Sequence, residues 1–404
     1  MTITRLALAY ARRRPLATLL VVLLLAVGTS VVGLTMMITR ELEARLYRDA
    51  EGIDLVVGAK GSPLQLVLAG VYHVDVPPGN IPLEAVDELR ANPSIASAIP
   101  LALGDSLRGN RIVGTEPALV EHYRGRLAAG SMWQQPMEAV LGSDVARTSG
   151  LQLGSTFAGS HGLSDVGGEH ADAPYRVVGV LAPSGSVMDR LVLTSVESVW
   201  KVHDAHQKKP GVDDDHDEHA ENGGREVTLV LVRYNSPVAA ASLPRKINSE
   251  TNYVAASPAY ETARLLSVFG VGIDLLRAFA YLLIAASALM LFVALAQALD
   301  ERRYDLAILR ALGAHRGQIA WVLLAESLTL AAIGAALGLA IAHGVAGLLA
   351  RIVPAATPLA GAASTFHPEE VLVALVAIGA GILAALWPAW QAYRLDVAAT
   401  LADT

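Results

Sequence analysis

The sequence predicts an integral membrane α-helical protein with four transmembrane helices and a large extracytoplasmic α+β domain of two subdomains, inserted between helices 1 and 2. Its 404 residues are 53% hydrophobic and only 17% charged, whereas soluble domains carry roughly 25% charge. The apolar residues gather in four runs, one near the N-terminus and three near the C-terminus, with a long polar stretch after the first run. These observations exclude a wholly soluble chain and a disordered one.

Two further counts exclude whole classes of function. The chain has no cysteine, so disulfides, thiolate catalysis and Cys-based metal sites are excluded. Its net charge of −7 provides no overall basic surface, and we therefore expect no nucleic-acid partner.

The first apolar run, residues 16–37, follows an N-terminal segment (1–15) that ends in Arg12, Arg13 and Arg14. It contains no charge and, at about 1.5 Å per residue, is long enough for the ~30 Å hydrocarbon core. The alternative is a secretory signal peptide, but the run is longer than the roughly 7–15 residues of a typical apolar signal region and lacks a small-x-small cleavage site. We expect a retained membrane anchor.

The other spans are expected at residues 275–299, 319–350 and 370–390. They leave three short segments, which are a loop at 300–318, a loop at 351–369 and a tail at 391–404. Lys and Arg concentrate in the N-terminal segment and the 300–318 loop, so both termini and that loop are expected in the cytoplasm. The polar stretch 38–274 and the 351–369 loop are expected outside.

The polar stretch 38–274 carries 20 Lys and Arg against 30 Asp and Glu. Its middle part, about 129–225, is rich in glycine and predicted strands such as Tyr175–Leu181, whereas the flanks, about 50–128 and 226–262, mix helices and strands. This pattern predicts a β-rich subdomain inserted into a mixed one. A helix is expected at Ile81–Ala91, and a strand at Glu226–Arg233.

Residues Leu64–Val76 form an unusually apolar stretch after the first span. They could line a cavity above the membrane that contacts substrate or lipid, or they could be part of the core or of a dimer interface.

The 300–318 loop has the pattern of a short amphipathic helix that ends at Gly313. Its sequence is Asp300-Glu-Arg-Arg-Tyr-Asp-Leu-Ala-Ile-Leu-Arg-Ala-Leu-Gly-Ala-His315. Two interpretations fit it: an interfacial helix whose arginines meet lipid phosphates, or a docking helix for a cytoplasmic partner.

This segment resembles the coupling segment of the MacB/FtsX-type (type VII, four-helix) ABC transporter permease superfamily, which includes the lipoprotein-releasing permeases. The C-terminal sequence Trp387-Pro-Ala-Trp-Gln-Ala-Tyr-Arg394, followed by Ala399-Thr-Leu401, is similar to the family's ending. One departure is Asp396-Val397, where the family often has a proline. The large domain after a single N-terminal span also matches the family's pattern.

The resemblance implies a non-catalytic membrane subunit in the bacterial inner (cytoplasmic) membrane, with its large domain periplasmic. It implies coupling of ATP hydrolysis by a separate cytoplasmic ABC ATPase dimer to movements of the outer domain, for export or extraction of a lipoprotein, peptide or small molecule. The alternative is an FtsX-like regulatory scaffold for an outer enzyme or metal-linked partner. The chain has no Walker A sequence, so ATP and Mg²⁺ are expected only in the partner.

The resemblance further implies a second permease copy or paralogue, contact with membrane lipid, and a periplasmic adaptor, lipoprotein or hydrolase as outer partner. The residues it assigns to ATPase coupling are Glu301, Arg302, Arg303, Leu306, Leu309, Arg310, Leu312 and Gly313.

Within the third span, Gly334 and Gly338 have the small-x-x-x-small spacing of close helix packing, either inside the chain or between two copies. Glu326 is an intramembrane acid, either a helix-packing residue or a proton or substrate site. His343 is expected to be a helix-packing residue.

The segment 202–221 has two His-x-x-His pairs among acidic residues, namely His203, His206, His216 and His219. Imidazole suits zinc and other divalent metals, so a metal site is one interpretation. A solvated acidic loop with incidental histidines is the other.

Overall fold

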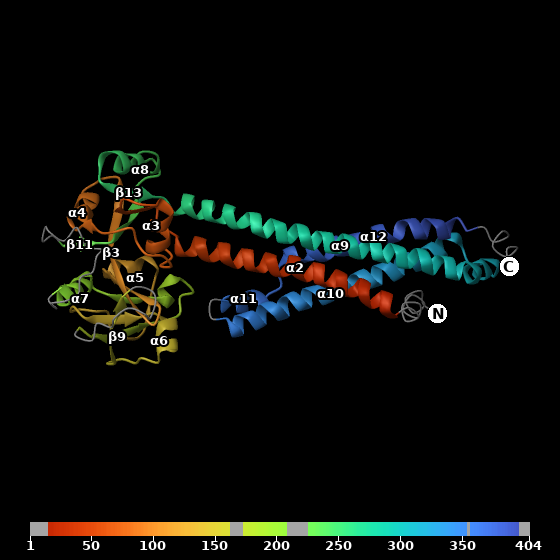
Figure 1. The fold of residues 1–404 in the computed structure, drawn as a ribbon, viewed down its shortest axis with the longest axis horizontal. Coiled ribbons are helices and arrows are strands. Elements are labelled where there is room, and N and C mark those ends of the chain that lie inside the picture. The colour runs from red at the N-terminus through yellow and green to blue at the C-terminus, as the bar shows by residue number, and fades with distance from the viewer. Residues whose placement is uncertain (1–14, 162–172, 208–224, 354–355, 396–404) are drawn as a thin grey trace. The chain divides into compact units, whose positions relative to one another are not determined.

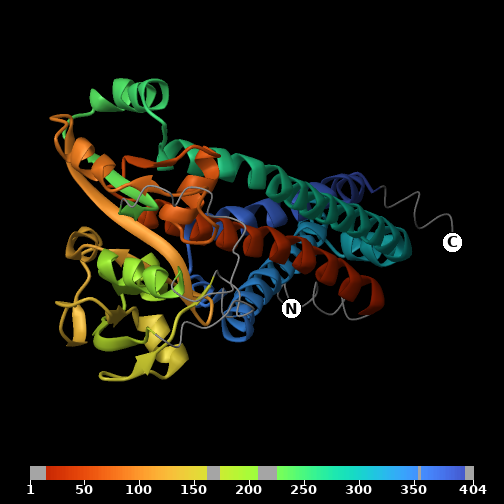
Figure 2. The same cartoon turned by 60° about the vertical axis from the view of Figure 1, so that its left-hand side comes forward.

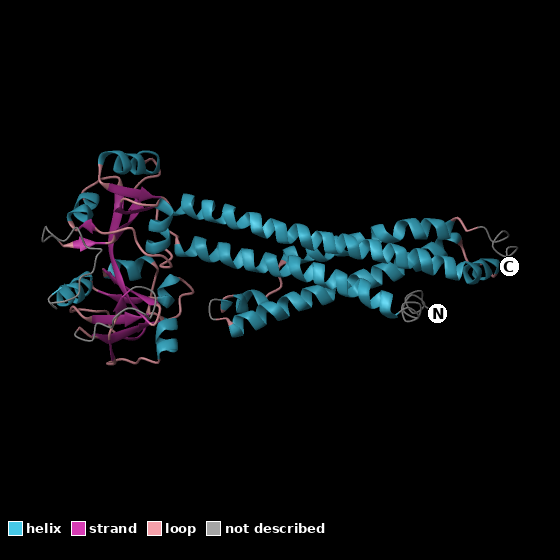
Figure 3. Ribbon diagram, viewed as in Figure 1, coloured by secondary structure: helices cyan, strands magenta, loops and turns pink. Residues whose placement is uncertain are grey.

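The computed structural model describes residues 15–161, 173–207, 225–353 and 356–395, and divides into two compact units. The helical unit comprises residues 1–43 and 267–404, and the sheet unit comprises residues 44–266. Figure 1 labels the elements of both units, and Figure 3 shows that the strands belong to the sheet unit. Each unit is described separately below.

Four described helices are long and apolar enough to cross a membrane, which confirms the predicted four-helix architecture. They are α2 (Pro15–Asp49), α9 (Pro258–Ala311), α10 (Arg316–Ile352) and α12 (Pro368–Tyr393). A short helix, α11 (Leu359–Ser364), lies between α10 and α12 in the chain. The last residues of α2 and the first residues of α9 belong to the sheet unit.

The predicted short amphipathic helix at 300–318 is not a separate element, because α9 continues without a break to Ala311. The physical reason is that no glycine or proline, the two residues that most oppose helix, occurs between residues 275 and 312. The span and the coupling segment are therefore one helix of 54 residues.

The sheet unit is built on an 11-stranded mixed sheet. Its strands are β1 (Leu55–Ala59), β3 (Ile95–Leu107), β4 (Asn110–Thr115), β5 (Leu127–Gly130), β6 (Glu138–Leu141), β7 (Thr156–Phe157), β8 (Ser160–His161), β9 (Tyr175–Leu181), β10 (Val192–Thr194), β12 (Leu229–Tyr234) and β13 (Tyr253–Ala256). The main path is β13-β1-β12-β3-β4-β10-β6-β9-β5, with β7 paired to β9 and β8 to β3. A separate pair joins β2 (Ile81–Pro82) and β11 (Glu226–Val227).

The helices of this unit are α3 (Pro63–Gly70), α4 (Glu84–Arg90), α5 (Pro117–His122), α6 (Ser143–Ser149), α7 (Val196–Gln207), α8 (Ala239–Glu250) and the 3₁₀ turn η1 (Val187–Arg190). The strand expected at Tyr175–Leu181 is confirmed as β9. The helix expected at Ile81–Ala91 is shorter than predicted, because Ile81 and Pro82 pair with β11 before α4 begins.

The strand expected at Glu226–Arg233 is divided at Thr228, whose hydroxyl accepts a hydrogen bond from the Leu103 N–H at 2.9 Å. Its second part, β12, is buried on both faces of the sheet. Leu229 and Leu231 join one apolar cluster, while Val230 and Val232 join another. This follows from the period of two along a strand, which sends successive side chains to opposite faces. The neighbouring strand β3, the long curved arrow in Figure 2, has 13 residues and a register shift between Leu103 and Ser106.

Candidate functional site

The predicted coupling segment forms the last turns of α9 and the corner that leads into α10. Gly313 has φ +105°, the left-handed conformation that favours glycine. The Gly313 N–H donates to Arg310 O at 3.0 Å, and the Ala314 N–H donates to Leu309 O at 3.0 Å. This pair of bonds is a Schellman motif, which satisfies the last carbonyls of a helix. The predicted helix end at Gly313 is thereby confirmed.

The following helix starts almost immediately. His315 is the N-cap of α10 and shares a capping box with Gln318, whose side chain accepts from the His315 N–H at 3.0 Å. Both helix ends at this corner are therefore capped by local hydrogen bonds. A contact made on the corner acts on two helices at once.

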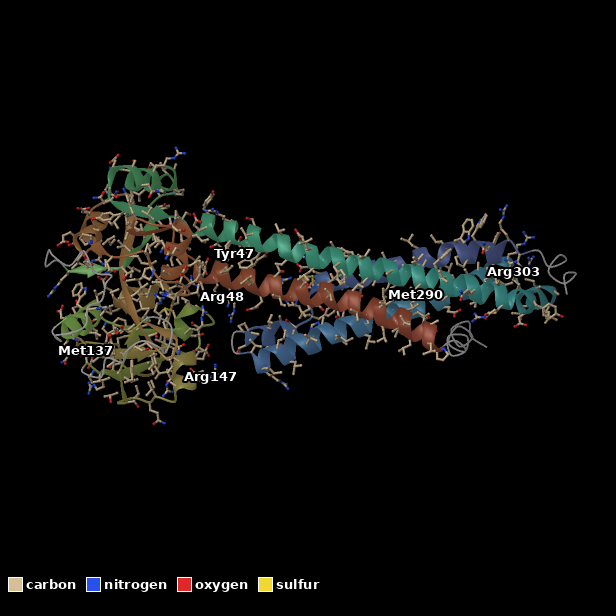
Figure 4. All side chains as sticks on the ribbon, in the orientation of Figure 1. Tyr47, Arg48, Met137, Arg147, Met290 and Arg303 are labelled. Carbon is tan, nitrogen blue, oxygen red and sulfur yellow. The ribbon has the colours of Figure 1, made fainter. Side chains whose placement is uncertain are left out.

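The eight predicted coupling residues divide between the surface and the interior of the helical unit. Glu301, Arg303, Leu309 and Leu312 are exposed, and Leu312 is 80% accessible. Arg303, labelled in Figure 4, pairs with Asp300 at 3.0 Å on the same helix face. These four residues are the ones that a cytoplasmic partner could contact, and we call them the exposed corner set.

Three other coupling residues, Arg302, Leu306 and Arg310, face inward, whereas Gly313 is exposed at the turn. Leu306 is 6% accessible and belongs to an apolar cluster with Ile319 and Leu323 of α10. Arg310 donates a hydrogen bond to the Leu395 carbonyl, which ties α9 to the residues after α12. These contacts stabilise the corner and do not present a binding surface.

Arg302 points inward to Glu326 of α10. Its Nη1 lies 3.3 Å from Glu326 Oε2, and the two side chains are only 11% and 8% accessible. A small cavity of about 20 Å³ adjoins the pair and is lined on the α2 side by Ala17 and Val21. A cavity of that size holds about one water molecule. The intramembrane acid predicted at Glu326 is thus paired with one of the predicted coupling arginines.

The two glycines predicted to pack helices face α2 of the same chain. A Cβ added to Gly338 would lie 2.6 Å from Ala26 O and 2.6 Å from Thr29 Cβ. A Cβ added to Gly334 would lie 2.8 Å from Leu25 Cδ2. Of the two roles left open by the sequence, the structure assigns these glycines to packing within the chain.

The end of α2 within the sheet unit is fixed by bonds to the loop 184–190. Asp49 Oδ1 accepts from the Val187 N–H at 2.8 Å, and Arg48 Nη1 donates to Gly185 O at 2.8 Å. The loop itself is folded around Asp189, whose carboxylate accepts from the Gly185 N–H at 2.7 Å. Figure 4 labels Arg48 at this end of the helix.

Tyrosines complete this arrangement. Tyr123 donates from its hydroxyl to Asp49 O at 2.7 Å. Tyr72 donates to Leu46 O at 3.2 Å and accepts from the hydroxyl of Thr262, near the start of α9. Burial raises the pKa of Tyr72 and of Tyr123, so both remain protonated donors.

We call the bonds of Arg48, Asp49, Tyr72 and Thr262 the helix anchor. It joins the end of α2 to the loop 184–190, to Tyr72 just after α3 and to the start of α9, all within the sheet unit. No sequence pattern indicates this anchor, since Tyr72 and Thr262 are 190 residues apart.

The apolar stretch Leu64–Val76 belongs largely to the core. Leu66 and Val67 of α3 are fully buried against the sheet, whereas Val74 and Val76 after the helix are exposed. Between them, His73 has φ +56°, and its Nδ1 makes no hydrogen bond within the described structure. Burial lowers the pKa of His73 to about 3, so its ring is neutral.

The predicted metal-binding histidines are only partly described. His203 lies on α7, half-buried, with Nε2 3.1 Å from the position of a Cβ at Gly104. The side chain of His206, and both His216 and His219, lie outside the described residues. Among the residues that are described, no group of three potential ligands is arranged to hold a metal. The metal site stays a prediction.

Comparison with known proteins now adds to these observations. Residues 18–250 match the MacB-like periplasmic core domain, and residues 277–397 match the FtsX-like permease C-terminal domain. No curated protein matches the chain. Two solved structures are similar at low identity. The first is the periplasmic region of MacB from Actinobacillus actinomycetemcomitans, at 14% identity over 56% of this chain and 97% of that one, with a TM-score of 0.35.

The second is the extracellular domain of the noncanonic ABC-type transporter YknZ from Gram-positive bacteria. It is 12% identical over 50% of this chain and 99% of that one, with a TM-score of 0.30. The two domain matches together cover part or most of each of the four candidate membrane-spanning helices and most of the sheet unit, leaving residues 251–276 unmatched. The chain therefore belongs to the MacB/FtsX-type superfamily of ABC transporter permeases.

Proposed function

We propose that this chain is the mechanotransmitting permease subunit of an ABC transporter complex. A dimeric cytoplasmic ATPase docks on the exposed corner set, and movement driven by ATP binding and hydrolysis passes along the helices to the sheet unit. The cargo is a periplasmic or membrane-derived molecule that is exported or extracted. A second copy of the chain, or a paralogue, completes the permease pair.

The observation that carries this proposal is the continuity of α9. Its C-terminal end forms the corner with Leu309, Leu312 and Gly313, and its N-terminal turn holds Thr262, bonded to Tyr72 in the sheet unit. An uninterrupted helix transmits a displacement along its axis with little loss, because each turn is hydrogen-bonded to the next. Family membership also implies association with a cytoplasmic ABC ATPase.

The test uses the full chain in lipid nanodiscs together with the ABC ATPase that copurifies with it. Leu309→Asp and Leu312→Asp place a charge on the exposed corner set, and we expect each to abolish copurification and stimulation of ATPase activity. Leu309→Met and Leu312→Met keep the apolar surface and serve as matched controls, expected to behave as wild type. If stimulation survives both aspartate variants, the docking site is assigned wrongly.

A second experiment concerns what the sheet unit acts on. The chain has no cysteine, so a single cysteine introduced at exposed Val74 or Val76 gives a defined crosslinking site. Crosslinks to an adaptor or a lipoprotein support export or extraction. Crosslinks to a hydrolase support instead a regulatory scaffold that reports the ATPase state to an outer enzyme.

A further inference from the structure

An acid–base cluster of two half-buried histidines and one buried glutamate lies in the helical unit, remote from the corner along α10. His343 is about 40 Å from Arg316 along this helix at the usual rise of about 1.5 Å per residue. Its partner is Glu370 in the first turn of α12, which is 0% accessible. Neither residue belongs to the exposed corner set or the helix anchor.

The two hydrogen bonds of His343 determine how many protons the His343–Glu370 pair must hold. Its Nδ1 lies 2.9 Å from Ala363 O of α11, and its Nε2 lies 2.8 Å from Glu370 Oε2. A carbonyl oxygen can only accept, so Nδ1 carries a hydrogen. The contact between Nε2 and Oε2 then requires one further proton, held either as imidazolium and carboxylate or as imidazole and carboxylic acid. Without that proton, the neutral imidazole has one N–H for two acceptors, so lone pairs face each other at one of the two contacts.

The second histidine of the cluster has a different role. His367 is the N-cap of α12, and its side chain accepts a hydrogen bond from the Glu370 backbone N–H. A ring nitrogen that accepts carries no proton, so the capping box fits a neutral His367. The His367 backbone N–H in turn donates to Glu370 Oε1 at 3.0 Å. The shared proton therefore belongs to His343 and Glu370.

The other titratable side chains nearby are those of His367 and Glu369. His367 Nδ1 lies 3.6 Å from Glu370 Oε1, and the adjacent Glu369 pairs with Arg40 of α2 at 2.7 Å on the exposed surface. Helix α11, whose sequence is Leu-Ala-Gly-Ala-Ala-Ser, has no titratable side chain. No other described ion pair involves Glu370.

We infer that His343 and Glu370 form a proton-binding latch that holds the ends of α10, α11 and α12 together. With the proton bound, His343 bridges the α11 carbonyl and the α12 carboxylate. When the proton is lost, the neutral imidazole has a single N–H and can donate to only one of the two acceptors, so one side of the bridge opens. On the predicted topology this end of the spans faces the outside, so the latch responds to external pH.

The sign of the pH effect follows from linkage. Near neutral pH the paired groups hold a proton that the separated groups release. The contribution of the pair to stability is therefore present at lower pH and is lost as pH rises and that proton leaves. A latch that opens in alkali is therefore the expected behaviour.

The test measures thermal unfolding of the full chain in nanodiscs from about pH 6 to about pH 9, a range that begins near the ordinary pKa of histidine. For the wild type we expect Tm to fall toward high pH by on the order of 2–4 °C. Glu370→Gln can keep the bridge without the extra proton, because its Oε1 accepts from the His367 N–H and its amide donates to neutral His343. This variant should lose the alkaline fall. Glu369→Gln, which alters the exposed neighbour, should retain it.

A second measurement does not depend on how the variant folds. Ring ¹⁵N spectra of histidine-labelled wild type, with the His343 signals assigned by His343→Gln, should show both nitrogens engaged with protons at neutral pH and loss of one proton in alkali. A neutral His343 beside an ionised Glu370 at neutral pH would overturn the latch. An alkaline fall in Glu370→Gln equal to that of the wild type would overturn it too.

Discussion

The two units stabilise their buried ionisable groups in different ways. The helical unit pairs each one with a side chain of opposite or complementary charge, as in Arg302–Glu326 and His343–Glu370. The sheet unit relies more on neutral groups and on backbone hydrogen bonds, as with His73 and with Asp49, whose carboxylate accepts from the Val187 N–H at 2.8 Å and also lies 3.5 Å from Arg190. The loops between strands have backbone N–H and C=O groups that can hydrogen-bond a buried side chain. In the interior of a helix these groups are already bonded to one another.

This difference predicts opposite responses to pH. A latch that needs a proton weakens in alkali, and a buried neutral histidine weakens the fold in acid. Arg302–Glu326 is different again, because an arginine is never deprotonated in a protein. Among its described residues, the helical unit therefore contains a buried pair that alkali does not release, Arg302–Glu326, and one that alkali can release, His343–Glu370. We call the first the permanent pair.

The largest expected effect comes from breaking the permanent pair. Arg302→Ala or Glu326→Ala leaves one charge buried without its partner, and we expect a loss of about 3–5 kcal/mol in the free energy of unfolding. The double variant Arg302→Met/Glu326→Leu removes both charges and should recover most of that loss. Denaturant unfolding in mild detergent measures both. A double variant as unstable as the single ones would show that the pair does more than compensate charge.

The next effect tests the neutral histidine of the sheet unit. The folded pKa of His73, about 3, is below the unfolded value, so the unfolded chain binds more protons and stability is lost as pH falls below the ordinary pKa. Relative to pH 7, we expect a loss of roughly 1–2 kcal/mol at pH 5. His73→Asn cannot be charged and tolerates the positive φ, so it should remove this acid loss. An unchanged acid profile would assign the effect to other groups.

The sequence predicted the elements more fully than it predicted the site. Strand β9 follows from the run Tyr175–Leu181, because its alternating burial matches a β-branched pattern bounded by Gly and Pro residues. The four spans follow from their length and lack of charge. The uninterrupted passage of α9 into the coupling segment could also have been predicted, since no helix-breaking residue separates them.

The side-chain partners could not be predicted in the same way. Arg302 and Arg303 are adjacent and chemically identical, and only the packing of α9 on α10 directs one to Glu326 and the other to the surface. His343 and Glu370 are 27 residues apart, and their contact depends on how α10 and α12 pack. Periodicity gives the face of a helix but not the partner that the face meets.

An effect of similar size is expected at the corner between α9 and α10. Gly313→Ala forces a Cβ into a left-handed conformation, which costs about 1–2 kcal/mol. The space around Gly313 is open, so the cost is conformational and not steric. The Schellman turn sets the angle between the two helices. We therefore expect ATPase stimulation to fall by more than the loss of folded protein alone would explain. Gly317→Ala, a glycine in open space on α10 with no positive φ, is the matched control.

The smallest expected change in stability comes from the arginine beside the permanent pair. Arg303 is about half exposed, and its bond to Asp300 is a surface pair within one helix, so Arg303→Ala should alter the free energy of unfolding by less than about 0.5 kcal/mol. Its loss should nevertheless weaken ATPase binding, because Arg303 belongs to the exposed corner set. Arg303→Lys keeps the charge and should retain part of that binding. Of the two neighbouring arginines, Arg302 would then mainly determine the free energy of unfolding and Arg303 mainly the binding of the ATPase. If Arg303→Ala is destabilising while ATPase binding is unaffected, the division between inward and exposed coupling residues is wrong.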